Sequence, residues 1–132
     1  MAKNMKMNIV TTILFLLIII GCDLLDNQED ETYLEGPAKV HYIEILGLTN
    51  NKIEFNVFAI VPSPCHYHSK TEKHRDKDDY YIKIFSRYDG EPCLGSGSTI
   101  EVYVSVITSS GEIDFHFWYS DTTSLDTTIT IP

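Results

Sequence analysis

The segment from Cys65 to Asp79 concentrates side chains that can ligate a metal ion. It holds His66, His68 and His74, and imidazole suits zinc, copper and nickel. On an extended backbone His66 and His68 would point the same way, because alternate residues share a face. Four basic residues in the segment disfavour a cation, and neither His-Glu-x-x-His nor Cys-x-x-Cys spacing is present. We therefore expect a solvated loop of mixed charge that interrupts the strands, with a metal site on the three histidines as the alternative.

The aromatic run 115–119 could bind a ligand or fill a core. On a strand, alternation sends its odd-numbered residues inward and leaves the even-numbered ones, Trp118 among them, on the opposite face. An outward Trp118 near Tyr103 or Tyr81 would form an aromatic platform for a carbohydrate or protein ligand. We expect instead that a second sheet or the loop 65–79 covers Trp118. A concave surface shared by Trp118 and that loop would favour ligand binding over a structural role.

Catalytic arrangements are not apparent, and we expect neither an enzyme nor a cofactor. The Ser-Gly repeat at Gly95–Ser98 lacks the spacing of a serine nucleophile elbow and of a phosphate-binding loop. Acidic residues are abundant, but no pattern pairs two of them across a cleft as a glycosidase requires.

Hydrophobic residues recur with a period of two from Ala38 onward, which predicts strands. Residues 52–61 place Ile53, Phe55 and the following odd positions on one face. In residues 99–108 the even positions from Ile100 to Val106 should face the core.

Residues 112–119 form a further strand, and Ser109–Gly111 predicts a tight turn that makes 99–119 a hairpin. We also expect strands at 39–47, 80–88 and 126–131, and no stretch of the sequence shows a convincing apolar helical stripe. Six to seven short strands predict an all-β fold, an antiparallel β-sandwich of immunoglobulin-like size, with a small barrel as the competing arrangement. The cysteines do not bracket a tryptophan, so this resemblance to immunoglobulin-like domains is architectural.

The N-terminus predicts a secretory signal peptide at residues 1–21. Lys3 and Lys6 precede an apolar run from Ile9 to Ile20, which as a helix would be too short to cross a bilayer core of roughly 30 Å. The end of this run, Ile19-Ile20-Gly21-Cys22, resembles the lipobox of bacterial lipoproteins. The resemblance implies that Cys22 receives a diacylglycerol and becomes the new N-terminus, and that two or three acyl chains hold the protein stably at a membrane.

The lipid on Cys22 leaves Cys65 and Cys93 as a pair. Because an exported protein meets an oxidising compartment, we expect a Cys65–Cys93 disulfide. Cleavage also leaves eight basic against nineteen acidic residues, a formal charge of −11. Such a surface disfavours nucleic acid and direct docking on anionic lipid.

Residues 22–37 contain six acidic residues and no basic one, which predicts a flexible, disordered tether before a domain at 38–132. Within the tether, Gln28–Glu31 resembles the export signal of surface lipoproteins in Bacteroidetes-type bacteria, and Asp23 resembles the inner-membrane retention signal of enterobacterial ones. The third option is an acidic spacer that carries no localisation signal. We therefore expect a lipid-anchored lipoprotein of the cell envelope with a non-enzymatic binding or structural domain. The first resemblance would place it at the outer membrane or the cell surface. The alternative is a metal-binding lipoprotein.

Overall fold

The computed structural model describes residues 34–90 and 92–132. The predicted signal peptide, the lipidation site Cys22 and most of the predicted tether lie outside these residues. The described part is all-β, contains no helix, and has no segment that could cross a membrane as a helix. The first strand begins at Leu34, so residues 34–37 of the predicted tether belong to the sheet.

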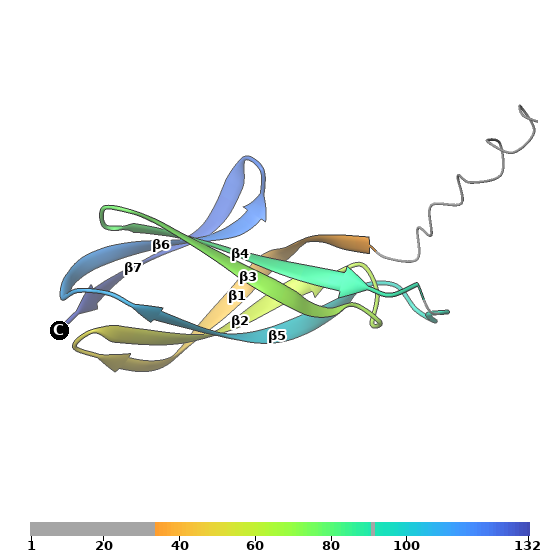
Figure 1. Ribbon diagram of the computed structural model, residues 1–132, viewed down its shortest axis with the longest axis horizontal. Helices are drawn as coiled ribbons and strands as arrows, with labels where there is room; N and C mark the ends of the chain where they lie inside the picture. Colours follow the sequence, from red (N-terminus) through yellow and green to blue (C-terminus); the bar gives the residue numbers. More distant parts are fainter. Residues whose placement is uncertain (1–33, 91) are drawn as a thin grey trace, which may run out of the picture. The chain divides into compact units, whose positions relative to one another are not determined.

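Seven strands make up the domain (Figure 1). They are β1 (Leu34–Thr49), β2 (Lys52–Val61), β3 (Tyr67–Asp76), β4 (Asp79–Tyr88), β5 (Ser98–Ile107), β6 (Gly111–Ser120) and β7 (Thr123–Ile131). Each of the six strands expected by position from hydrophobic alternation is present. The seventh, β3, occupies the segment that we predicted to be a loop. That prediction was wrong because β3 pairs with β4 alone and most of its side chains are exposed. The strand therefore lacks the alternating apolar residues by which a strand is recognised in a sequence.

The strands form one curled, mixed sheet in the order β5-β2-β1-β4-β6-β7, with β3 on the other edge of β4. Strand β1 joins the two parts of this sheet. Its residues 34–38 pair with β4, and its residues 39–49 pair with β2. All pairs are antiparallel except β4 with β6, which run parallel from Asp79 opposite Asp114 to Ile82 opposite Phe117. The expectation of a wholly antiparallel arrangement therefore fails at this pair.

Strands β5 and β6 do not form the hairpin that the turn at Ser109–Gly111 predicted. Strand β5 pairs with β2, whereas β6 pairs with β4 and β7. The short connection passes from one part of the curled sheet to the other, and Gly111 takes a φ of 127°, which favours glycine. In Figure 1, β2 and β5 accordingly lie on one side of the domain and β6 and β7 on the other.

The core forms where the two parts of the sheet face each other. Phe55 of β2 contacts two rings of β6, Phe115 and Phe117, with centroids 5.0 and 5.2 Å apart. The predicted inward positions of β2 are buried, as are Val102, Val104 and Val106 of β5. Tyr119, which we expected in the core, is 42 % exposed. A register shift between Trp118 and Ser120 interrupts the alternation there.

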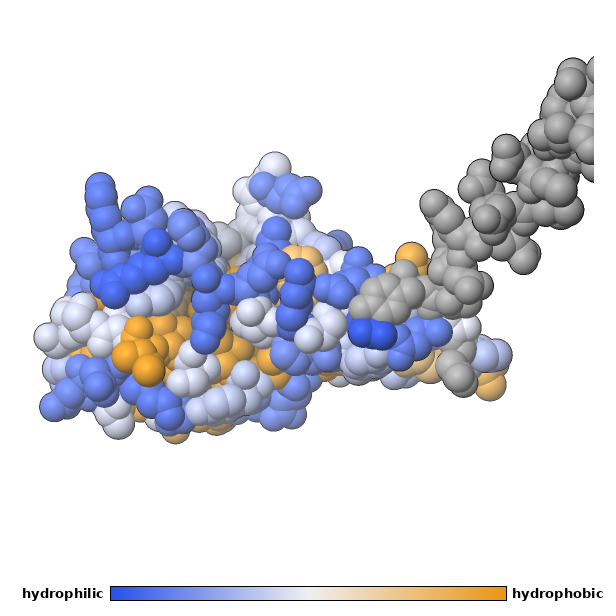
Figure 2. All heavy atoms as spheres, in the orientation of Figure 1, coloured by the Kyte–Doolittle hydropathy of each residue, from blue (hydrophilic) through white to orange (hydrophobic). Residues whose placement is uncertain are grey.

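Hydrophilic side chains cover most of the face drawn in Figure 2, with hydrophobic side chains exposed between them. Ile45 and Leu48 lie opposite the buried Phe55 and Ile53, yet both are at least 40 % exposed. The inward face of the β1–β2 hairpin is therefore incompletely covered near its turn.

Cys65 and Cys93 are joined as predicted, with their sulfurs 2.06 Å apart. The bond connects the segment between β2 and β3 to the segment between β4 and β5. The Gly97 amide donates to the carbonyl oxygen of Pro62 at 2.7 Å, which ties the same two segments a second time. These links fix the end of the domain where β2 and β4 finish.

Candidate functional site

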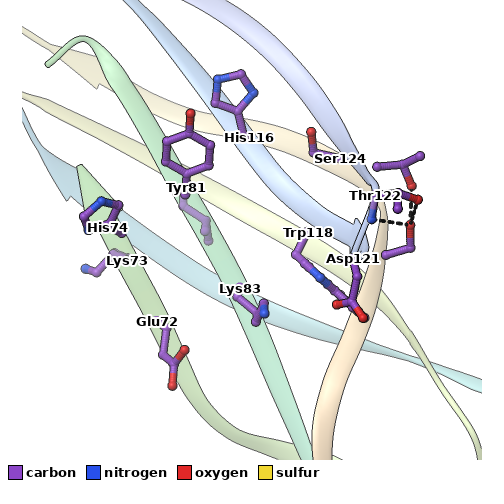
Figure 3. A pocket seen from close by; sticks show the side chains of 13 residues that line it. Glu72, Lys73, His74, Tyr81, Lys83, His116, Trp118, Asp121, Thr122 and Ser124 are labelled. Carbon is purple, nitrogen blue, oxygen red and sulfur yellow. Dashed lines mark hydrogen bonds between the residues drawn. The ribbon is translucent and has the colours of Figure 1, made fainter. Parts of the chain in front are cut away.

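A groove of about 540 Å³ lies over β3, β4, β6, β7 and the turn between the last two strands. This volume is within the usual range for small-ligand sites. Figure 3 shows its side chains converging from these four strands. Its lining comprises Glu72, Lys73, His74, Tyr81, Ile82, Lys83, His116, Trp118, Ser120, Asp121, Thr122, Thr123 and Ser124.

The first row of side chains across the groove consists of His74, Tyr81 and His116, and Asp126 continues this row on β7 beyond the groove lining. Strand register sets them side by side, because His74 is opposite Tyr81, Tyr81 opposite His116, and His116 opposite Asp126. The Tyr81 ring stacks on the His116 ring with centroids 4.8 Å apart, and the His74 ring is 6.2 Å away on β3. The parallel β4–β6 pairing thus builds a ladder of three rings.

The second row consists of Glu72, Lys83, Trp118 and Ser124. Glu72 is opposite Lys83, and Trp118 is opposite Ser124. The Lys83 ammonium lies 5.3 Å from the centroid of the Trp118 ring, which is a cation–π distance. On each strand the members of the two rows are two positions apart, so both rows point to the same face of the sheet.

Trp118 carries an unusual polar group in this groove. Its indole Nε1 is buried and has no hydrogen-bond partner among the described residues. A buried donor without an acceptor costs about 1–3 kcal/mol, and tryptophan at binding surfaces normally uses this N–H. An acceptor supplied by a ligand, with a small rotation of the indole, would remove that cost.

His116 is held between two carboxylates. Its Nε2 is 2.9 Å from Asp79 Oδ1 on β4, and its Nδ1 is 2.9 Å from Asp126 Oδ1 on β7. The hydrogen bond to Asp79 raises the pKa of His116 above its ordinary value, aided by Asp126 and opposed by partial burial. Hydrogen bonds from Ser124 and His116 lower the pKa of Asp126. His116 therefore links β4, β6 and β7 at the β6 end of the ring ladder.

This arrangement predicts a pH-dependent stability. Because the pKa of His116 is raised in the folded state, its stabilisation is complete below its ordinary pKa of 6.5 and is lost as pH rises through the folded value. Between about pH 5.5 and about pH 8.5, we expect the wild-type free energy of unfolding to fall by about 0.5–1 kcal/mol more than that of His116→Gln, since such pairs are partly screened. Urea unfolding at both pH values measures the difference.

His68→Gln is the matched control, because His68 is exposed and its ring bonds the Thr71 hydroxyl, at 2.9 Å, rather than a carboxylate among the described residues. It should retain the wild-type pH dependence. A His116→Gln curve parallel to that of the wild type would rule out this role of His116.

The structure does not bring His66, His68 and His74 together. His66 bonds Ser63 at 2.8 Å and stacks on Tyr88, His68 bonds Thr71, and His74 lies beside Tyr81. In residues 34–90 and 92–132, no three His, Cys, Asp or Glu side chains are grouped closely enough to hold a metal ion. His66 and His68 would share a face only if both were on one strand. Strand β3 begins at Tyr67, so His66 lies outside it.

The two predicted binding residues lie in different places. Trp118 lines the groove, whereas Tyr103 is exposed on β5, where its hydroxyl donates to Glu54 of β2. Tyr81, the other tyrosine considered in the sequence, lines the same groove as Trp118. Trp118 is partly buried but lines the groove, and β3 forms one wall of it. Trp118 and the segment 65–79 therefore share a concave surface.

Sequence reasoning missed the roles of Lys83 and His116. Both follow from the parallel register of β4 and β6, which carries no local sequence signal. Only the period of two, which puts Lys83 and Tyr81 on one face of 80–88, could have suggested part of the set.

The fold and the groove together define an all-β domain with one aromatic and charged concave face. No protein-family model, curated protein or solved structure matches the chain.

Proposed function

We propose that this chain is a lipid-anchored lipoprotein of the bacterial cell envelope, whose domain binds a ligand without catalysis. The groove shared by Trp118 and β3 is the observation that carries the binding role. The groove combines the exposed Tyr81 ring, the charged Lys83 and a Trp118 indole N–H that has no partner among the described residues. Such a combination within one concavity is typical of a site that orients a small ligand. The membrane anchor rests on the lipobox-like sequence ending at Cys22.

The proposal includes an immunoglobulin-like β-sandwich as the architecture of the domain. The packing of Phe55 on two rings of β6 supports two layers, and the switch of β1 from β4 to β2 supports layers that share a strand. An acidic segment before Leu34 would hold the groove away from the headgroups. Among the possible locations, the resemblance of Gln28–Glu31 to an export signal favours the outer membrane or the cell surface.

Trp118 is the only tryptophan in the chain, so its fluorescence reports on the groove directly. The intact protein is mixed separately with saccharide, peptide and lipid fractions of the envelope and its surroundings. We expect one class of material to change the Trp118 emission. Tyr81→Ala should raise the concentration needed for half of that change at least tenfold, because the ring ladder is lost.

Tyr103→Ala is the matched control, since Tyr103 is another exposed tyrosine that lies outside the groove. It should respond as the wild type does. Unchanged emission with every class of material would contradict a binding role for the groove.

A further inference from the structure

Lys83 is a cation in the groove that makes no ion pair with any carboxylate among the described residues. Six of the eight basic residues in 34–132 lie on the β3–β4 hairpin, although the domain has excess acid. Among the described residues, Lys70 pairs with Glu72 at 2.9 Å, so the acid opposite Lys83 is already engaged. The Lys83 ammonium has ring contacts instead, with Trp118 at 5.3 Å and Phe85 at 6.0 Å. An anionic group on a ligand would complement this charge.

The second donor is the Trp118 indole N–H, which is buried and meets a ligand when the indole turns toward the groove. The unpartnered Nε1–H belongs to the indole whose ring centroid is 5.3 Å from the Lys83 ammonium. A carboxylate has two oxygens and accepts several hydrogen bonds. One carboxylate could accept from both donors, and a charge-assisted bond is stronger than a neutral one.

The β6–β7 end of the groove offers hydroxyl and carboxylate groups. Ser120 Oγ is 2.7 Å from Thr123 Oγ1 and 3.4 Å from Thr122 Oγ1, and Asp121 lies in the same turn (Figure 3). Hydroxyls can donate and accept, whereas a carboxylate only accepts. This end suits a ligand that has hydroxyl donors as well as acceptors, which a simple anion lacks.

The floor of the groove is the face of a sheet, where the backbone groups of β4 and β6 are paired with neighbouring strands. A peptide normally binds a sheet by adding to its edge, where free backbone groups await partners. On this face only side chains meet the ligand. Discrete hydroxyls around a ring-shaped apolar face match separate side chains and an aromatic ring better than a peptide backbone does.

We propose that the groove binds an acidic saccharide, with a sugar carboxylate on Lys83 and the Trp118 indole and sugar hydroxyls on Asp121 and the neighbouring hydroxyl side chains. This inference rests on the binding role proposed above and names the class of ligand. It also explains why an acidic domain places an unneutralised lysine beside its one tryptophan.

The test titrates the intact protein in detergent with three uronic acid tetramers, built from galacturonate, glucuronate and mannuronate. Galactotetraose is the neutral control, and tetraglutamate is the acidic peptide control. Trp118 fluorescence and calorimetry give the affinities. We expect at least one uronate tetramer to bind at least tenfold more tightly than both controls, and more weakly as salt screens the charge.

Lys83→Gln should weaken uronate binding at least tenfold, whereas Lys77→Gln, which removes the same charge from the turn of the same hairpin, should leave it within twofold. Trp118→Phe keeps a ring without the N–H and should also weaken binding in calorimetry. Equal affinity for galactotetraose, or tighter binding of tetraglutamate, would overturn the acidic saccharide and leave a binding groove. No response to any probe would overturn the saccharide, and the separate response to envelope fractions then decides whether the groove binds at all.

Discussion

Phe55→Ala should destabilise the domain by about 3–5 kcal/mol. The Phe55 side chain is fully buried and contacts Phe115 and Phe117, so its loss leaves a cavity where the two parts of the sheet meet. A domain of this size has a total stability of about 5–15 kcal/mol. The variant would therefore unfold at a much lower urea concentration, as measured by Trp118 fluorescence.

Phe58→Ala is the control on the same strand, because Phe58 points to the other face and is only partly buried against Tyr42. It should cost about 1 kcal/mol. If Phe55→Ala fails to fold, Phe55→Leu leaves a smaller cavity and should still destabilise the domain more than Phe58→Leu does. Equal losses for Phe55→Ala and Phe58→Ala would contradict the placement of the core.

Replacing both Cys65 and Cys93 by serine should lower the free energy of unfolding by about 3.5 kcal/mol. The two cysteines are 28 residues apart, and a loop of that length restricts the unfolded chain by about this amount in the chain-entropy model. Urea unfolding of the double variant and of the oxidised wild type measures the difference.

Reduction of the wild type with dithiothreitol should move its unfolding midpoint to that of the double variant. Leu94→Ala tests the same segment without touching the bond, and since Leu94 is 96 % exposed it should have little effect. An unchanged midpoint after reduction would mean that the bond does not stabilise the fold.

The sequence predicted strands well where one face is buried. In β2 and β5 every second residue is apolar and the structure buries nearly all of these positions, because alternate side chains share a face. The disulfide was also predictable, since only Cys65 and Cys93 remain once Cys22 is assigned to a lipid. Strand β3 was not predictable, because it pairs with β4 alone and its side chains are mostly polar.

Pairing partners were the weakest part of the prediction. A short turn containing glycine favours a hairpin, but β5 and β6 belong to different parts of the curled sheet. The parallel register of β4 and β6 brings together Tyr81 and His116, which are 35 residues apart in the sequence. No local pattern encodes such a register, so Trp118 and Tyr81 could be proposed from the sequence, whereas the roles of Lys83 and His116 could not.

The lipid anchor is the claim on which the proposed place of the groove depends. Its most direct test is the intact mass of the protein extracted from bacterial membranes. We predict a chain that begins at Cys22 and carries the added mass of a diacylglycerol, with or without a further acyl group on its amine. A chain that retains Met1, or one cut before Cys22 with an unmodified sulfur, would contradict the account.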